Sequence, residues 1–211
     1  MLYYEKKLQS QGFDAVIGVD EAGRGPLAGP VVAAAVVLGN EPFKARIDDS
    51  KKLSCAQRER AFAEISGNSF FAVGMCDEKV IDAVNIAEAT RIAMEQAVGL
   101  LLERLPSGCK PYVIVDGNVK LKTSVPCTAI IRGDSKSKSI ASASIVAKVT
   151  RDRIMADYDK EFPQYGFSRH KGYPTRQHRS ALEKFGYSRI HRLTFCGVRE
   201  SSAAAGTKAV F

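Results

Sequence analysis

The feature that most constrains the fold is a short apolar run that closes on two adjacent acids. Residues 16–20 read Val-Ile-Gly-Val-Asp, Glu21 follows, and a turn rich in glycine and proline leads into a second apolar run at residues 30–38. Short, largely β-branched runs indicate buried strands, and the turn between them predicts an antiparallel hairpin. Asp20 and Glu21 are therefore expected at a strand end, beside a shaped loop.

The rest of the chain alternates between strand-like and helix-like patterns. Strands are predicted at residues 70–76, 112–115 and 125–131, and helices at 54–64, 85–102, 137–161 and 177–185. Ser54 is placed to cap the first of these helices. The order predicts an α/β fold with helices packed against a mixed sheet. We expect one domain over residues 1–200, helical and basic from about 162 to 198, and a disordered tail over 201–211.

The formal net charge of +8 favours a polyanionic partner such as nucleic acid. Because many basic proteins bind no nucleic acid, the distribution of charge is more informative than its sum. Between residues 165 and 199 there are eight Lys or Arg residues, and Glu183 is the only acid. The C-terminal segment is therefore the expected partner-facing surface.

The cysteines and the apolar stretches limit where such a protein works. The five cysteines are scattered and form no C-x-x-C pair, which argues against a zinc site and against a disulfide framework. The N-terminus lacks the apolar run of a signal peptide, and no stretch reaches the length of a membrane span. We expect a cytoplasmic protein with no membrane contact that acts as a monomer.

Four acids recur at the ends of predicted strands: Asp20, Glu21, Asp116 and Asp134. Ligands gather at strand ends in open α/β sheets, and carboxylate oxygens suit hard divalent cations. An acid beside glycine can merely shape a turn, but three strands that end alike favour a metal site. Neighbouring strand residues point to opposite faces, so Asp20 and Glu21 can serve one metal only if the strand breaks or bulges there.

Other nucleotide-binding and hydrolytic motifs do not fit. The glycines at 23, 25 and 29 have the wrong spacing for a dinucleotide-binding loop and precede a strand rather than a helix. No G-K-[ST] sequence closes a phosphate-binding loop of the Walker type, and no G-x-S-x-G nucleophile elbow occurs. The spacing of the three histidines does not suggest zinc.

Several segments carry groups that suit phosphate. Glycines on both sides of Arg24 would let the backbone approach a ligand while the guanidinium meets a phosphate. The stretch 133–139 opens a helix with alternating serines and lysines, including Lys136 and Ser139, which favours phosphate contact over simple capping. The small residues that follow would let this helix lie close to the sheet and bring Asp134 near the other acids.

Two further segments leave alternatives open. Ser50 and Lys51 belong either to a solvated loop or to a contact with a nucleic-acid backbone. Tyr173, which follows Lys171 in the basic segment, either stacks on a sugar or base or fills a structural turn.

Together these motifs closely resemble the ribonuclease HII family, and the resemblance runs from about Val16 to Arg192. The segments that carry it are Asp20–Pro26, Asp49–Ser54, Val115–Asn118, Gly133–Asp134, Ser139–Asp152 and His170–Thr175.

The resemblance implies a ribonuclease H-like fold and an endonuclease that cuts RNA within RNA–DNA hybrids and at single ribonucleotides embedded in duplex DNA. It implies 3′-hydroxyl and 5′-phosphate ends, two divalent ions (Mg²⁺ or Mn²⁺) about 3.5–4 Å apart, and roles in replication and ribonucleotide excision repair. The family's four acids fall on Asp20, Glu21, Asp116 and Asp134. Its glycine-arginine-glycine motif falls on Gly23, Arg24 and Gly25, and its tyrosine that senses the 2′-hydroxyl on Tyr173.

The departures from the family pattern are mild. Ser135 and Ser142 stand where alanine is common, Arg132 stands where lysine is frequent, and residues 193–197 drift from the usual ending. The sister family ribonuclease HIII fits less well, because its acidic motif lacks the glycine-arginine-glycine run. Two alternatives stay open: another metal-dependent nuclease or strand-transfer enzyme of the same fold, and a nucleic-acid-binding protein without catalysis.

Overall fold

The computed structural model describes residues 1–200, and the predicted tail at 201–211 lies outside the described residues. The chain divides into two compact units. Unit 1 comprises Met1–Ala22, Val32–Met75 and Thr90–Val149, and unit 2 comprises, among the described residues, Gly23–Val31, Cys76–Ala89 and 150–200. The expectation of one catalytic domain over residues 1–200 stays a prediction.

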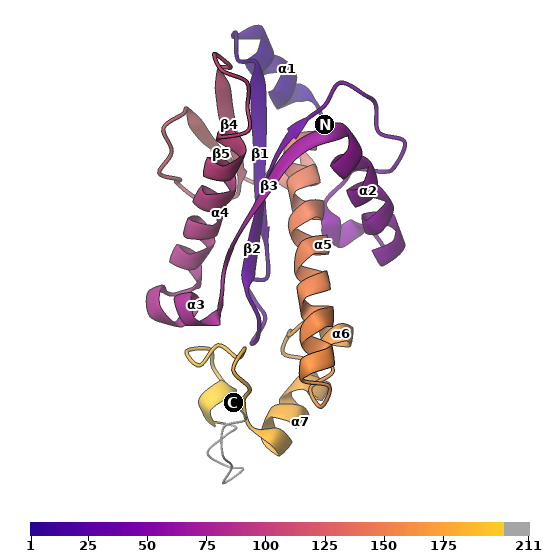
Figure 1. The fold of residues 1–211 in the computed structure, drawn as a ribbon, viewed down its shortest axis with the longest axis vertical. Coiled ribbons are helices and arrows are strands. Elements are labelled where there is room, and N and C mark those ends of the chain that lie inside the picture. Colours follow the sequence, from indigo (N-terminus) through magenta and orange to yellow (C-terminus); the bar gives the residue numbers. More distant parts are fainter. Residues whose placement is uncertain (201–211) are drawn as a thin grey trace. The chain divides into compact units, whose positions relative to one another are not determined.

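A five-stranded mixed sheet forms the centre of unit 1 (Figure 1). Its order is β3-β2-β1-β4-β5, where the strands are β1 Ala15–Ala22, β2 Val31–Leu38, β3 Ser69–Cys76, β4 Pro111–Asp116 and β5 Cys127–Ile130. Strands β1 and β2 are antiparallel, whereas β4 runs parallel to both β1 and β5. The predicted hairpin and the predicted mixed sheet are both confirmed.

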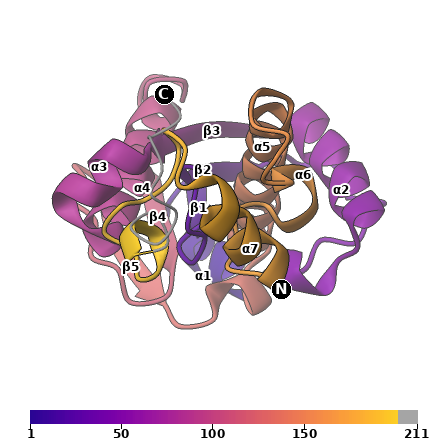
Figure 2. The same ribbon diagram turned by 90° about the horizontal axis from the view of Figure 1, so that it is seen from below.

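Helices cover both faces of this sheet (Figure 2). On one face, α2 (Cys55–Asn68) and α5 (Lys138–Glu161) share an apolar cluster with β2. On the other face, α4 (Ile86–Leu102) lies so close to β3 that a Cβ atom at Gly74 would be 2.2 Å from the Ala93 carbonyl oxygen. Side chains alternate along β3, so Phe71 and Val73 pack towards α2 while Gly74 faces α4.

Helix α5 lies directly against β1, as its small residues predict. A Cβ atom at Gly18 would be 2.2 Å from the Ser139 carbonyl carbon, so only glycine allows this approach. Ala141, Ala143 and Ala147 are fully buried in the same interface. This packing fixes the segment before α5, which carries Asp134, relative to the end of β1.

Unit 2 has its own apolar core. Its helices are α3 (Glu78–Val84), α6 (Phe167–His170), α7 (Arg176–Phe185) and the last turns of α5. The core includes Met155, Tyr165, Phe167 and Leu182, and the rings of Tyr165 and Phe167 stack at 5.3 Å. The predicted helical character of residues 162–198 is therefore confirmed for two short helices joined by turns.

The predicted elements match the observed ones closely, with three omissions. Ser54 caps α2 as predicted, and its side chain and that of Gln57 form a reciprocal capping box. Helix α1 (Tyr3–Ser10), α3 and α6 were not predicted, because each is short and carries too few buried positions to show a helical period. All five cysteines are free thiols. Within residues 1–200, no helix combines the length and the apolar character that crossing a membrane requires.

Candidate active site

Three of the four predicted acids come together in unit 1. Carboxylate oxygens of Asp20, Asp116 and Asp134 lie within 4.8 Å of one another. The topology explains this, because β1 and the parallel strands β4 and β5 deliver their carboxyl ends to one edge of the sheet. Asp20 lies near the end of β1, Asp116 ends β4, and Asp134 lies in the 3₁₀ turn (Gly133–Ser135) that follows β5. We call these three residues the acid cluster.

Glu21 is not part of the acid cluster in this structure. Strand β1 pairs with β2 without interruption through Glu21 and Ala22, so the break that we expected at this point is absent. Because the strand stays regular, the Glu21 side chain leaves the opposite face from Asp20. The Glu21 backbone N–H donates to Asp20 Oδ1 at 2.7 Å. A role for the Glu21 carboxylate as a metal ligand stays a prediction.

Backbone hydrogen bonds orient Asp116 and Asp134. Asp116 Oδ1 accepts from the N–H groups of Gly133 (2.6 Å) and Asp134 (3.3 Å). Gly133 packs closely there, because a Cβ atom would lie 2.6 Å from Ile140 Cδ1 and 3.4 Å from Asp116 Oδ1. The turn after β5 is thus tied to the end of β4, and this tie brings Asp134 to Asp116.

The electrostatics of the acid cluster are unfavourable without a cation. Burial, together with the charges of Glu21 and Asp116, raises the pKa of Asp20 well above its usual range. Burial and the charges of Asp116 and Asp49 also raise the pKa of Asp134. Burial would lower the pKa of Lys51, but Asp49 and the acid cluster raise it instead. Lys51 is therefore a cation close to the acids.

Ser50, predicted as a contact to nucleic acid, is buried beneath the acid cluster. Its hydroxyl lies 2.9 Å from that of Ser144, and Ser144 in turn hydrogen-bonds to Asp20. Ser50 is only 5% exposed, and through Ser144 its hydroxyl supports the Asp20 carboxylate. A contact of Ser50 with the substrate stays a prediction. The sequence showed its polarity but not its burial.

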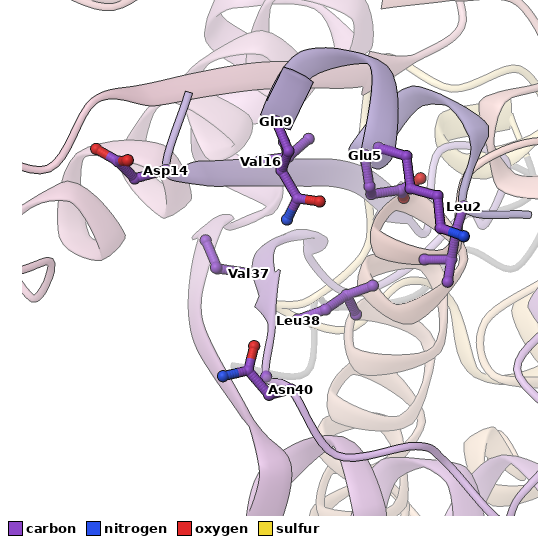
Figure 3. A pocket seen from close by; sticks show the side chains of 10 residues that line it. Leu2, Glu5, Gln9, Asp14, Val16, Val37, Leu38 and Asn40 are labelled. Atoms are coloured by element: carbon purple, nitrogen blue, oxygen red, sulfur yellow. The ribbon is translucent and has the colours of Figure 1, made fainter. Parts of the chain in front are cut away.

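Ser139 is likewise engaged inside the protein. Its N–H and its hydroxyl both donate to Glu5 Oε1 at 2.9 Å, and the Ser137 hydroxyl donates to the same oxygen at 2.6 Å. Glu5, on the unpredicted helix α1, thus occupies the position at the start of α5 where a phosphate was expected. Figure 3 shows Glu5 at a cavity of about 310 Å³ that Val16, at the beginning of β1, also lines. Lys136, by contrast, is exposed.

The predicted 2′-hydroxyl-sensing residues meet in unit 2. Gly23 has a φ of +97° and is buried, whereas Arg24 and Gly25 are exposed. A Cβ atom at Gly25 would lie 3.7 Å from Tyr173 Cε1, so the tyrosine ring lies beside the bare Gly25 backbone. The Tyr173 side chain is 40% exposed. Lys171 is half-buried, with a φ of +54°.

A model of the ribonuclease HII family matches residues 17–198. The chain belongs to the ribonuclease HII family. It is 49% identical to a ribonuclease HII from Geotalea daltonii, covering 95% of this chain and 91% of that relative. A ribonuclease HII from Ruminiclostridium cellulolyticum is 53% identical and covers 92% and 75%. The crystal structure of ribonuclease H2 from Pyrococcus horikoshii matches with a TM-score of 0.73 at 27% identity, over 92% of this chain and all of that one.

Family membership makes the chain an endoribonuclease, a hydrolase of the ribonuclease H type with the corresponding fold. Family membership therefore favours neither alternative from the sequence: a nucleic-acid-binding protein without catalysis, or another metal-dependent nuclease or strand-transfer enzyme of the same fold.

Two arginines that sequence reasoning did not single out as functional are fully buried in unit 2. Arg151 and Arg192 are both 0% exposed, and their guanidinium groups donate to backbone carbonyls of the loop after Gly23. Arg192 was counted only as part of the basic surface. An arginine in a basic segment carries no local mark of burial, so the sequence could not have separated it from its exposed neighbours.

The three histidines also pack together, although they show no metal-binding pattern. His178 Nδ1 lies 3.0 Å from the Tyr173 carbonyl oxygen, and its Nε2 lies 3.0 Å from His191 Nε2. His191 Nδ1 accepts from the Ser188 N–H at 2.9 Å. One set of neutral tautomers satisfies this chain: His191 donates to His178, and His178 donates to the Tyr173 carbonyl.

Proposed function

We propose that this ribonuclease HII family member hydrolyses the RNA strand of RNA–DNA hybrids and also cuts at single ribonucleotides embedded in duplex DNA. Cleavage would leave 3′-hydroxyl and 5′-phosphate ends. The observation that carries the proposal is the acid cluster, in which carboxylate oxygens from three separate segments lie within 4.8 Å of one another. The comparisons supply the enzyme class, and the loop residues beside Tyr173 support the choice of substrate.

The residues of the acid cluster fit divalent metal ions. All the donors are carboxylate oxygens, which suit Mg²⁺ or Mn²⁺. Burial first, and then the neighbouring acids, raise the pKa values of Asp20 and Asp134, and a bound cation would oppose both effects. Asp20, Asp116 and Asp134 would hold the ions, with Glu21 as a further ligand. Bound divalent ions, two in our proposal, polarise the scissile phosphate and supply an activated water.

The chain itself would recognise the ribose. The 2′-hydroxyl is what distinguishes RNA from DNA at a given nucleotide. Gly25 is exposed and bare, so its backbone can approach a sugar closely, and the Tyr173 ring lies beside it. Asp20 precedes Gly23 by only three residues, so the loop that begins at Gly23 continues directly from the strand that carries Asp20.

Basic residues would hold the nucleic-acid backbone without reading base sequence. Arg169, Arg176, Arg179 and Lys184 are exposed on unit 2, and Lys51 and Lys136 are exposed on unit 1. Lys171, two residues before Tyr173, adds a half-buried charge. Binding through such contacts weakens steeply as salt rises. Action as a cytoplasmic monomer in ribonucleotide repair and replication stays a prediction.

The experiment incubates the purified protein with three labelled duplexes: an RNA–DNA hybrid, a DNA duplex with one ribonucleotide, and the same duplex without it. Each is tested with Mg²⁺, with Mn²⁺ and with chelator. We expect metal-dependent cleavage of the first two and none of the third. Cleavage of all-DNA duplex would indicate a nuclease that ignores the ribose, and binding without cleavage would overturn the catalytic assignment.

Tyr173→Phe tests the sensing role separately. The phenylalanine keeps the ring beside Gly25 and removes only the hydroxyl. We expect a lower kcat/KM on the duplex with one ribonucleotide, by about tenfold for a lost hydrogen bond in the reacting complex. Cleavage equal to that of the parent would show that the hydroxyl of Tyr173 is not required.

A further inference from the structure

We propose that Arg151 and Arg192 are positioning residues for ribose recognition. Together they fasten the recognition loop, defined as Gly23–Pro30, and they connect it to the tyrosine turn, defined as Lys171–Tyr173. We call the two guanidinium groups the arginine clamp. The inference rests on the proposed function, and it states which residues set the preference for a ribonucleotide.

Arg192 holds both ends of the recognition loop. Its Nη1 donates to the Arg24 carbonyl at 3.0 Å, and its Nη2 donates to the Gly23 carbonyl at 2.6 Å. Its Nε donates to the Gly29 carbonyl at 2.9 Å. One planar guanidinium therefore ties the start of the loop to its end, which a lysine with a single ammonium could not reproduce.

Arg151 joins the recognition loop to the tyrosine turn. Its Nε donates to the Pro30 carbonyl at 2.9 Å and its Nη2 to the Ala28 carbonyl at 3.1 Å. Its Nη1 donates to the Lys171 carbonyl at 3.0 Å, two residues before Tyr173. The Arg151 guanidinium also lies 6.0 Å from the centre of the Tyr173 ring. The side chain thus holds the two recognition segments in one arrangement.

The backbones of the loop and the turn also meet directly, which leaves little freedom between them. The Leu27 N–H donates to the Gly172 carbonyl at 2.8 Å. A Cβ atom at Gly172 would lie 2.6 Å from the Ala28 carbonyl oxygen, and one at Gly23 would lie 2.1 Å from Arg151 Nε. Glycine is therefore required at both positions for the clamp to close.

The clamp also sets the direction of the recognition groups. A trans peptide places each carbonyl opposite the N–H of the next residue. Because the carbonyls of Gly23 and Arg24 point to Arg192, the N–H groups of Arg24 and Gly25 point away from it. Arg24 and Gly25 are the exposed residues of the loop beside Tyr173. Arg192 would therefore aim two adjacent donors outward without touching the substrate.

Both cations stay charged at neutral pH despite their burial. Burial and the neighbouring Arg151 lower the pKa of Arg192 to about 9, and burial lowers the pKa of Arg151 to about 10. Burying two positive charges is costly unless each is fully hydrogen-bonded, and the carbonyls supply those bonds. A pair of apolar residues would fill this space without orienting any carbonyl.

The test measures ribose selectivity by binding affinity, so the result does not depend on the rate of cleavage. Full-length protein with Asp116→Asn, which stops cleavage, is titrated in Mg²⁺ with a duplex containing one ribonucleotide and with the identical all-DNA duplex. Selectivity is the ratio of the two Kd values. We expect Arg192→Lys to lower this ratio towards one, while affinity for all-DNA duplex stays within about twofold because charge is conserved.

Arg189→Lys is the matched control. Arg189 lies three residues earlier in the same segment, is exposed, and pairs with Glu161 at 2.6 Å. This control should keep the full selectivity. A general loss of structure would lower affinity for both duplexes together, whereas loss of the clamp lowers the ratio. If Arg192→Lys does not fold, by circular dichroism, Arg151→Lys is measured in the same way.

The outcomes separate the inference from the proposed function. If the Asp116→Asn protein itself binds both duplexes equally and the parent does not cut at the ribonucleotide, the proposed function fails. If that protein is selective and the folded lysine variant is equally selective, the positioning role of the clamp is overturned while the proposed function stands.

Discussion

The acid cluster and the arginine clamp both bury charge, but they do so in opposite ways. In the acid cluster, burial and, after it, neighbouring like charges raise the pKa of Asp20 and of Asp134, so ionising these carboxylates costs more than it does in water. In the arginine clamp, all three nitrogens of each guanidinium group donate to a backbone carbonyl at 2.6–3.1 Å. Within the protein, the charges of the first region are only partly compensated, by Lys51, whereas the second region is fully hydrogen-bonded.

This difference indicates what each region is for. A cluster with unrelieved repulsion gains stability when a divalent ion binds, so it is suited to bind and release metal. A fully hydrogen-bonded network gains nothing from a ligand and is suited to hold geometry. Removing charge should therefore stabilise the first region and destabilise the second.

The largest expected effect is on cleavage, in Asp116→Asn. The asparagine carbonyl can still accept from Gly133 and Asp134, so the turn keeps its place, but the cluster loses a charge. We expect cleavage to fall about a thousandfold or more, with substrate binding retained. Cleavage assays and binding titrations on the same preparation measure both quantities.

The same variant tests the repulsion directly. Without metal, the free energy of unfolding of Asp116→Asn should exceed that of the parent by about 1 kcal/mol, because Asp20 loses a neighbouring charge. With Mg²⁺, the parent should become the more stable of the two. A variant less stable than the parent in chelator would show that the cluster is not strained, and full cleavage would refute its metal role.

In contrast to Asp116→Asn, Arg192→Met is expected to lower the free energy of unfolding. Methionine fills part of the space but leaves the carbonyls of Gly23, Arg24 and Gly29 without a donor. Breaking a buried polar network in this way costs about 3–5 kcal/mol. Urea unfolding followed by circular dichroism measures the loss. A variant within about 0.5 kcal/mol of the parent would mean that water replaces the guanidinium, contrary to a complete network.

Acid should weaken unit 2 through its histidines. Burial lowers the pKa of His178 to about 4 and that of His191 to about 3, both below the ordinary value of 6.5. A histidine whose pKa is lowered on folding contributes stability that is complete above pH 6.5 and is lost as pH falls towards 4. Each residue should cost about 1.4 kcal/mol per pH unit in that window.

The acids of unit 1 change the free energy of unfolding in the opposite direction with pH. Their raised pKa values mean that ionisation costs stability, so this cost is absent below about pH 3.8 and grows as pH rises. Asp20→Asn reduces that opposing contribution. In this variant we expect the free energy of unfolding to fall by about 2–3 kcal/mol between pH 6.5 and pH 5.5. A flat profile there would mean that the buried histidines are not held neutral.

The sequence predicted the strands and a convergence of four acids, of which three meet in the structure, for a definite physical reason. Each acid follows an apolar run and precedes glycine or a turn, and parallel strands carry their ends to one edge. The sequence was wrong about a break at Glu21, because pairing with β2 continues through Ala22 and nothing in the local residues reveals that pairing. From their polarity it also named Ser50 and Ser139 as substrate contacts. The structure buries both side chains, and the contacts stay a prediction.

The buried supports could not be predicted in the same way. Arg192 bonds to carbonyls more than 160 positions away, and a carbonyl has no side-chain identity to recognise. Glu5 bonds to Ser137 and Ser139 more than 130 positions away, from a helix too short to show a period. Both contacts join residues far apart in the sequence, and no local pattern identifies the partner of either charged side chain, so only the fold reveals them.

The smallest expected effect is in Glu5→Gln, which links helix α1 to the start of α5. The amide keeps one accepting oxygen for Ser137 and Ser139, but the bonds lose their charge, and the favourable charge at the N-terminus of α5 is lost. We expect about 1 kcal/mol of lost stability and a higher Mg²⁺ concentration for half-maximal activity, because Asp134 precedes this helix start. Lys6→Gln is the control, since Lys6 is exposed on the same helix. If both variants match the parent in stability and in Mg²⁺ dependence, Glu5 does not help to position Asp134. The acid cluster is then held by β4 and Gly133 without a contribution from α1.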